Sequence, residues 1–469
     1  MPSKNTPEIS EEMNNFLEIT RIPRPSGHTE RIRAFLEGFA DRLGLGHKKD
    51  EAGNLYVHRP GKGKRIVLQA HMDMVPTCSP GMDFDFTTTP VEAVIEDGWV
   101  HAKGTTLGAD DGAGIAMAMC ALSDPSLEGI DIGCLFTVDE EVGLIGASKI
   151  PENWFEGDLM VNLDEEDDGQ IVFGCAGNAM ITASVSHPLE DFRGFTYRID
   201  LEGFQGGHSA GEIDKGRENP ILLLARLVHS VEGARLSLLE GGNAFNAIPM
   251  TASIVFSVPI DVNVYDVLEP LSENLMAELE KSEPGAQLTF GKATFMPSWN
   301  EKDTKEFLDA LLKLPNGLIR SAGFGPVTSS NLGTAVTEDG RITLGIMPRS
   351  SEEGVLGTLV SEIASVLTAC GAEIPEPLVV PTWSGSPDGE LCVKAAEVYR
   401  EHFGREPRVL SVHGGLECGI IMGRLPSIRE AVCIGPTILG AHSTTEKMSV
   451  QSISDVKSYL FALIRALSA

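Results

Sequence analysis

The sequence predicts an α/β domain with a mixed, mainly parallel central sheet, plus an inserted α+β domain. Short apolar runs alternate with helix-like segments in the first third of the chain, which is the pattern of strand–helix–strand units. The middle third changes to alternating polar and apolar strands, and the first pattern resumes near the end. A length of 469 residues also exceeds what one compact core holds. We place the α/β domain at 1–179 and 381–469, and the insertion at 180–380.

The first third supplies the parts of a buried sheet and its helices. Residues 30–42 carry apolar side chains at helical spacing, and 112–122 are small and apolar, which suits a helix packed closely on a sheet. The apolar runs 65–70, 133–138 and 158–163 are short enough for buried strands.

The middle third favours an antiparallel sheet covered on one face, because its strands alternate and helices lie between them. The expected strands are 195–201, 251–258, 287–290 and 341–347, and the expected helices are 219–231, 265–281, 305–314 and 352–369. The proline-rich stretch 374–381 is interpreted as a linker. After it we expect helix 388–403, strand 431–434 and helix 454–467.

Composition excludes two classes of partner. Lys+Arg 37 against Asp+Glu 67 gives a net charge of −30 and a pI near 4.7, which argues against nucleic acid and anionic membranes. No apolar run approaches the roughly 18 residues of a membrane helix. The N-terminal residues lack the pattern of a secretory signal, and the eight cysteines contain no C-x-x-C. We therefore expect a cytoplasmic protein with free thiols.

Metal-binding residue types follow the apolar strands of the α/β part. Ligands bind beyond the carboxyl ends of strands in open α/β sheets, so these side chains are expected at one edge. A glycine-rich turn before helix 112–122 adds a carboxylate, and a loop after strand 431–434 adds a histidine. The segments are His71-Met-Asp73, Asp110-Asp111, Asp139-Glu140-Glu141, Asp164 and Gly440-Ala-His442.

Their number matches a pair of zinc ions that share one carboxylate. The predicted ligands are His71, Asp110 as the bridge, Glu141, Asp164 and His442. Glu140 remains as a general base for the attacking water. Asp73 is suited to orient the imidazole of His71.

Each segment has a plainer interpretation when taken alone. An H-x-D pair at a strand end is more often structural, and an acidic triplet is usually a solvated turn. Residues 164–169 superficially resemble a calcium loop, but Cys175 stands where that loop needs glutamate. The metal site therefore rests on the joint placement of the segments.

Ordered motifs along nearly the whole chain resemble the di-zinc exopeptidases related to aminoacylase and bacterial carboxypeptidase. They are His71-Met-Asp73, Gly104 to Asp111, Asp139-Glu140-Glu141, Asn162-Leu-Asp164 and Gly440-Ala-His442. Further motifs are similar to the aminoacyl-histidine dipeptidase (cytosolic non-specific dipeptidase) branch. These are Gly174-Cys-Ala-Gly177, Gly206-Gly-His208, Asn246-Ala-Ile-Pro249, His413-Gly-Gly-Leu-Glu417 and Gly435-Pro-Thr437.

The resemblance implies the same ligands and base, an inserted lid domain, and four substrate-binding residues. His208 would contact the developing oxyanion, and Asn246 with Arg349 would hold the substrate's carboxylate. Glu417 would meet the substrate's ammonium group. The alternatives are a turn histidine for His208, a surface arginine for Arg349 and a loop anchor for Glu417.

The expected activity is hydrolysis of unblocked dipeptides, Xaa-His included, by a hydroxide held between two Zn²⁺ ions. Mn²⁺ or Co²⁺ could replace zinc, and the expected partner is a small peptide substrate, with a homodimer left open. The alternatives are an N-acyl-amino-acid amidohydrolase or a tripeptidase on the same scaffold. A catalytically silent binding protein is disfavoured, because Glu140 and all five ligands are present.

Overall fold

The computed structural model describes residues 9–323 and 325–468, which fall into two compact units. Unit 1 comprises Met1–Gly174, Trp383–Ser411 and Leu416–Ala469, and unit 2 comprises Cys175–Thr382 and Val412–Gly415. The sequence placed the corresponding boundaries at 179/180 and 380/381. The use of unit 2 as a lid stays a prediction. The argument against a secretory signal drew on residues 1–8, which lie outside the described part.

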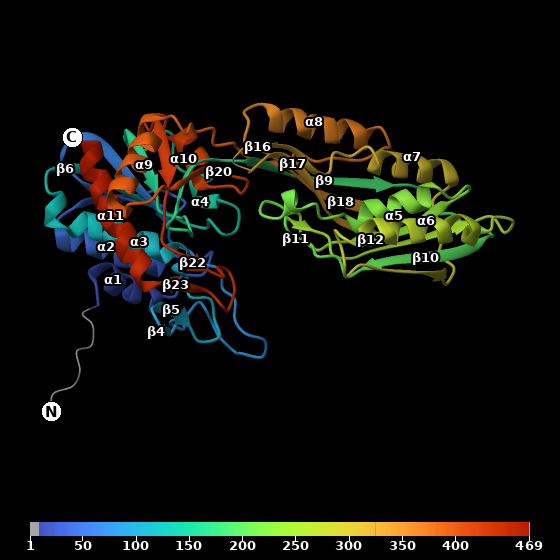
Figure 1. Cartoon of the computed structure of the whole chain (residues 1–469), viewed down its shortest axis with the longest axis horizontal. Helices are drawn as coiled ribbons and strands as arrows, with labels where there is room; N and C mark the ends of the chain where they lie inside the picture. The colour runs from blue at the N-terminus through green and yellow to red at the C-terminus, as the bar shows by residue number, and fades with distance from the viewer. Residues whose placement is uncertain (1–8, 324, 469) are drawn as a thin grey trace. The chain divides into compact units, whose positions relative to one another are not determined.

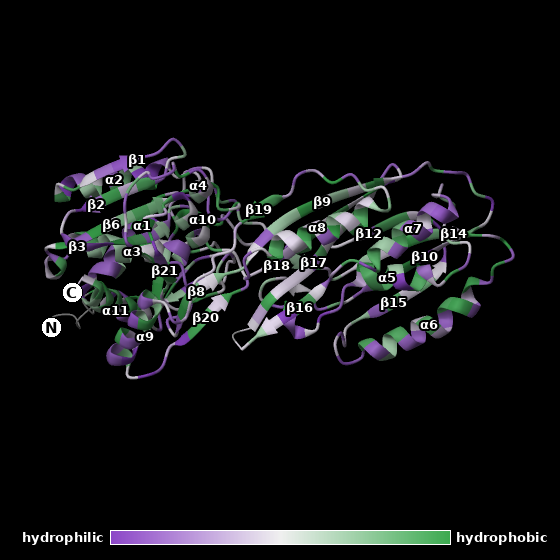
Figure 2. Ribbon diagram, turned by 90° about the horizontal axis from the view of Figure 1, so that it is seen from above, coloured by the Kyte–Doolittle hydropathy of each residue, from purple (hydrophilic) through white to green (hydrophobic). Residues whose placement is uncertain are grey.

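Unit 1 is built on an eight-stranded sheet in the order β1-β2-β6-β3-β7-β21-β8-β20. The four central strands β6, β3, β7 and β21 are parallel, while β1, β2 and β8 pair antiparallel, so the mixed sheet expected from the sequence is confirmed. The exposed edge strand β1 is hydrophilic and the central β6 is hydrophobic (Figure 2). The strands are β1 (Gly46–Lys49), β2 (Leu55–Arg59), β3 (Lys62–His71), β6 (Ile130–Thr137), β7 (Leu159–Asn162), β8 (Gln170–Cys175), β20 (Arg408–Val412) and β21 (Glu430–Cys433).

Helices α3 and α11 pack on β3, and α9 packs on β21. The small side chains of α3 are almost all buried, which lets the helix approach the sheet closely. Helix α1 in turn lies against α3. The helices of this unit are α1 (Glu11–Thr20), α2 (Glu30–Leu43), α3 (Ala109–Ser123), α4 (Ile145–Ser148), α9 (Glu390–Phe403), α10 (Glu417–Arg424) and α11 (Val450–Ser468).

A smaller sheet in unit 1 fixes the path of the C-terminal segment. Its order is β22-β23-β5-β4, formed by β4 (Ala93–Glu96), β5 (Trp99–Ala102), β22 (Ile438–Leu439) and β23 (Lys447–Ser449). The hairpin of β22 and β23 encloses the loop that carries His442. Antiparallel pairing of β23 with β5 then ties this loop to the first third of the chain.

Unit 2 contains an antiparallel sheet in the order β15-β10-β14-β12-β17-β18-β9-β19, with β16 paired to β17. Helix α5 packs on β10, β12 and β14, and α8 packs on β9 and β18 (Figure 1). The apolar side chains between helices and sheet form a separate core. The elements are β9 (Gly177–Ser186), β10 (Phe195–Glu202), β11 (Gly207–His208), α5 (Pro220–His229), β12 (Arg235–Gly241), β13 (Ala247–Ile248), β14 (Ala252–Val258), α6 (Val264–Leu279), β15 (Gln287–Lys292), α7 (Glu301–Leu311), β16 (Gly317–Ala322), β17 (Gly325–Glu338), β18 (Arg341–Ser350), α8 (Val355–Thr368) and β19 (Leu378–Val380).

The proline-rich stretch 374–381 is more ordered than the expected linker. Its residues 378–380 form β19, which pairs antiparallel with β9. Proline cannot donate to a ladder, so the flanking Pro377 and Pro381 are compatible with a short strand at the sheet edge. Among the described residues, no helix is both long enough and apolar enough to cross a membrane.

Candidate metal centre

The carboxyl ends of three parallel strands bring the predicted ligands together. His71 is the last residue of β3, Asp164 follows β7 by two residues, and the acidic pair Glu140-Glu141 follows β6. Because β6, β3 and β7 are parallel neighbours, these positions share one edge of the sheet. Asp110 enters the same place from the first turn of α3.

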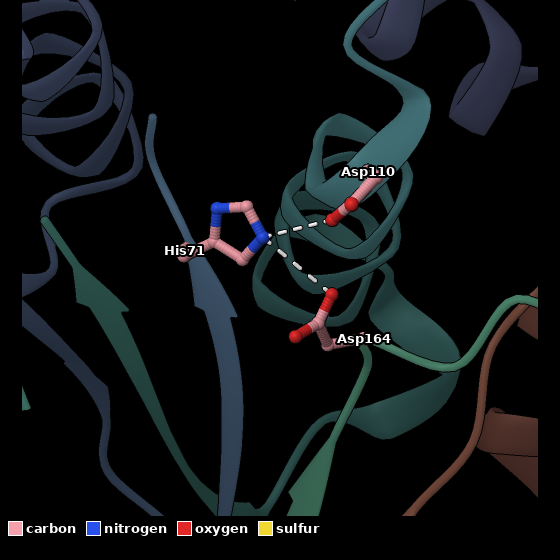
Figure 3. Close-up of side chains that lie close together, drawn as sticks. All are labelled: His71, Asp110 and Asp164. Carbon is pink, nitrogen blue, oxygen red and sulfur yellow. Dashed lines mark hydrogen bonds and ion pairs between the residues drawn. The ribbon is translucent and has the colours of Figure 1, made fainter. Parts of the chain in front are cut away.

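His71 faces two carboxylates (Figure 3). Its Nε2 lies 2.9 Å from Asp110 Oδ1 and 3.5 Å from Asp164 Oδ1. Its Nδ1 lies 3.1 Å from the backbone oxygen of Asp73, which can only accept a hydrogen bond. The Nδ1–H is therefore directed at this carbonyl, and Nε2 is left to ligate a metal.

His442 faces the other side of Asp110. Its Nε2 lies 2.9 Å from Asp110 Oδ2 and 2.9 Å from Glu141 Oε2. The two oxygens of Asp110 thus point at two different histidines, which is the arrangement of a bridging carboxylate. The second oxygen of Glu141 is buried and has no hydrogen-bond partner among the described residues.

Three groups of potential ligand atoms lie within 4.8 Å of one another. They are His71–Asp110–Asp164, His71–Glu140–Glu141 and Asp110–Glu141–His442. The structure therefore brings together all five predicted ligands and the predicted base, although their roles stay predictions.

The electrostatics of the group suit divalent cations. Burial and the nearby charges of Asp164, Glu417 and Glu141 raise the pKa of Glu140 well above its usual range. Burial, with Asp110 adding to it, does the same for the pKa of Asp164. Hydrogen bonds to Asp110 and Glu141 raise the pKa of His442 to about 11.

Positions that favour a proton so strongly also favour a metal ion, which competes with the proton for the same ligand atoms. Two imidazoles and three carboxylates form a nitrogen and oxygen donor set that suits zinc. The residues present therefore fit a pair of divalent cations.

Asp73 supports both the histidine and the acidic pair. Its Oδ1 accepts a hydrogen bond from the backbone N–H of Glu140 (3.0 Å), and its Oδ2 accepts from Glu141 N–H (3.3 Å) and Ser26 Oγ (2.8 Å). Although burial opposes it, His71 and these hydrogen bonds lower the pKa of Asp73 to about 2. Its Oδ1 lies 3.5 Å from His71 Nδ1, whereas the backbone oxygen of Asp73 lies 3.1 Å from the same nitrogen.

Two buried charged residues that the sequence analysis did not name contact the ligand-bearing segments. Arg24 donates to the backbone oxygens of Met72 and Asp73. Glu446 accepts hydrogen bonds from the backbone of the turn before Asp110. A signal existed for Glu446, since it lies in the same short loop as His442.

Glu417 is fully buried in unit 1, at the start of α10. Its Oε2 accepts hydrogen bonds from Gln69 Nε2 (2.6 Å) and Thr137 Oγ1 (2.7 Å). These contacts are those of the loop anchor that was the alternative interpretation of this residue. A contact with the substrate's ammonium group stays a prediction.

The other predicted substrate residues lie in unit 2. His208 in β11 and Asn246 beside β13 are exposed, with Asn246 Nδ2 3.4 Å from His208 Nε2. Arg349 in β18 is buried, unlike the surface arginine of the alternative interpretation. Its Nη1 donates to the backbone oxygen of His413 (3.4 Å), and no carboxylate pairs with it among the described residues. Burial lowers the pKa of Arg349 to about 10.

Comparison with known proteins agrees with this geometry. The chain is 33% identical to the cytosol non-specific dipeptidase of Escherichia coli (strain K12), over 97% of each chain. A crystal structure of aminoacylhistidine dipeptidase from Vibrio alginolyticus superposes with a TM-score of 0.87 at 31% identity, covering 98% of this chain and 97% of that one. A tripeptidase structure from Staphylococcus aureus shares the fold, with a TM-score of 0.58 at 19% identity and 98% of each chain covered.

The family resemblance found in the motifs is confirmed by a match to a whole-family model. The model described as peptidase family M20/M25/M40 matches residues 67–466, which include every predicted ligand and the predicted base. The chain belongs to peptidase family M20/M25/M40.

Proposed function

We propose that this protein is a metal-dependent dipeptidase, which hydrolyses the peptide bond of unblocked dipeptides, Xaa-His dipeptides among them. The observation that carries the proposal is the position of Glu140, whose carboxylate lies in one group with His71 and Glu141. A base placed beside metal ligands suits metal-assisted hydrolysis of an amide. The similarity to a named dipeptidase over 97% of the chain supports the choice of substrate.

Two zinc ions are the proposed cofactors. His71 and Asp164 would hold one ion, Glu141 and His442 the other, and Asp110 both, in keeping with the contacts that its two oxygens make with the two histidines. When bound, such a pair lowers the pKa of a water and polarises the scissile carbonyl.

Glu140 is the proposed general base and acid. It accepts a proton from the attacking water, whose oxygen forms the new bond to the carbonyl carbon. It then returns the proton to the leaving amine nitrogen as the C–N bond breaks. The raised pKa of the buried Glu140 carboxyl suits this cycle, because a base must also hold the proton until the amine leaves.

Unit 2 supplies the proposed substrate-recognition residues. Arg349 carries a buried guanidinium without a carboxylate partner among the described residues, and a planar fork of donors suits a free peptide carboxylate. Asn246 would add an amide donor to the same carboxylate. His208 is proposed to stabilise the oxyanion that develops on the scissile carbonyl.

A substrate panel with metal analysis on the same purified sample tests the proposal. We expect hydrolysis of free dipeptides, loss of activity with a chelator and recovery with zinc. Matched tripeptides, N-acetyl amino acids and N-acetyl dipeptides are the controls, and each is expected to react poorly. Preferential hydrolysis of N-acetyl amino acids or tripeptides, or full activity without metal, would contradict the proposal.

We also propose a cytosolic location, after the name of the E. coli relative. A homodimer stays a prediction, which a measurement of molecular mass in solution would test.

A further inference from the structure

The turn that carries Asp110 is held by a buried carboxylate from the far end of the sequence. Glu446 is only 3% exposed, and both its oxygens accept hydrogen bonds from consecutive backbone N–H groups. Oε2 accepts from Leu107 (2.7 Å) and Gly108 (3.1 Å). Oε1 accepts from Ala109 (2.7 Å) and Asp110 (3.4 Å).

Consecutive N–H groups at the start of a helix form a site for an anion. Here they belong to the two residues before α3 and to its first two residues, and the protein's own carboxylate takes the position of the anion. Since a carboxylate buried without donors would be strongly unfavourable, Glu446 and the turn stabilise each other's conformation.

A buried cation holds the same turn through its carbonyl. Arg24 Nη2 donates to the backbone oxygen of Gly108. Its Nη1 donates to the oxygens of Met72 (2.9 Å) and Asp73 (2.7 Å), in the segment that follows His71. Gly108 has φ +72°, and a Cβ there would lie 2.7 Å from Arg24 Nη2, so only glycine allows this approach.

These contacts connect three of the ligand-bearing segments. Glu446 lies four residues after His442, in the loop between β22 and β23, and it binds the turn of Asp110. Arg24 joins that turn to the segment after His71. Asp110 must place one oxygen 2.9 Å from each of the two histidines, which requires a turn that does not shift.

We propose that Glu446 and Arg24 are positioning residues, which hold Asp110 between the two cation sites without touching the cations. The inference rests on the proposed two-metal function. Removal of such supporting contacts lowers metal affinity by roughly 10- to 100-fold in other sites.

Glu446→Gln tests the proposal directly. Glutamine offers one carbonyl oxygen, and its NH₂ group would face N–H donors that need an acceptor. We expect metal affinity, measured by competition with a chromophoric chelator, to fall by about 10- to 100-fold. The visible spectrum of the Co²⁺-loaded protein should also change, because it reports on ligand geometry.

Glu12→Gln is the matched control. Glu12 is a buried carboxylate of the same unit, but its partners are Ser454 and Lys457 in α11, and among the described residues no hydrogen bond or ion pair joins it to the ligand segments. We expect this variant to bind Zn²⁺ and Co²⁺ as the unmodified protein does, whatever its effect on unfolding.

Four results separate the inference from the proposed function. An unmodified protein that binds no divalent metal would overturn the proposed function itself. If it binds metal and Glu446→Gln binds equally well with an unchanged spectrum, only the positioning role fails. Equal losses of metal affinity in Glu446→Gln and Glu12→Gln would also overturn the positioning role, because they would show a general effect of destabilisation. Should Glu446→Gln not fold, Glu446→Asp and Arg24→Lys keep the charges but shorten their reach, and unchanged affinity in both would refute the inference.

Discussion

Replacing Arg349 with methionine is expected to make the protein more stable and its substrate binding worse. Arg349 is 4% exposed, and its donors find only the backbone oxygen of His413 and the sulfur of Met347 among the described residues. A buried cation without a counter-charge disfavours the folded state. It is tolerated, in our account, because the substrate's carboxylate completes the pair.

The magnitude follows from the lowered pKa. Burial lowers the pKa of Arg349 from 12.5 to about 10. At pH 7 the Arg349 side chain is charged in both the folded and unfolded states. The full cost of burying its charge therefore destabilises the folded state, by about 3 kcal/mol. Methionine keeps part of the apolar packing, and we expect a gain in unfolding free energy of about 1–3 kcal/mol. Loss of charge-assisted hydrogen bonds of about 1.5–3 kcal/mol should raise KM for dipeptides roughly 10- to 150-fold.

The assay combines urea denaturation with kinetics on a dipeptide and its C-terminal amide. The unmodified enzyme should prefer the free carboxylate, and Arg349→Met should lose that preference. Arg341→Met is the control on the same strand, because Arg341 is exposed and pairs with Glu373. It should change neither stability nor preference by more than a small amount. A destabilised Arg349→Met that still discriminates dipeptide from amide would refute the reasoning.

Two further predictions concern His442 and His413. His442→Ala should lower bound zinc from two equivalents to about one, by elemental analysis, because it removes one side of the Asp110 bridge; a full two-zinc complement would contradict its role as a ligand. Burial, with Arg349 adding to it, lowers the pKa of His413 to about 4, so the unfolded state binds more protons below pH 6.5. The free energy of unfolding, measured by urea denaturation, should therefore fall as the pH drops from about 6.5 towards 4. His413→Asn should reduce this pH dependence. An identical pH profile in both proteins would contradict the lowered pKa of His413.

Much of unit 1 could be predicted from the sequence because its signals are local. The apolar runs 65–70, 133–138 and 158–163 correspond to β3, β6 and β7, and each is followed by residues of the metal centre. The metal site could be predicted because residues that follow parallel strands lie at one edge of the sheet, where ligands bind. Several histidines and carboxylates at that edge indicate a metal ion as the ligand.

Strand β17 was missed for a physical reason. Its sequence is rich in serine, threonine and glycine, which is typical of loops. In the structure several of these polar side chains are buried and paired, as with Ser329 Oγ at 2.7 Å from His413 Nε2 and Asn331 Nδ2 at 3.0 Å from the oxygen of Phe245. Such long-range partners leave no trace in local periodicity.

Arg24 was missed for the same reason. A single arginine in a proline-containing loop gives no sign that it will be buried, since most arginines are exposed. Its contacts with residues 72, 73 and 108 form only when the chain folds.

The central claim is that Glu140 moves protons in a site whose metals are held by other residues. Kinetics and metal analysis of Glu140→Gln on one sample test it most directly. We predict full zinc content and a fall in kcat on dipeptides of roughly 10²- to 10⁴-fold, since glutamine cannot accept the proton. Near-normal turnover with both metals bound would contradict the account.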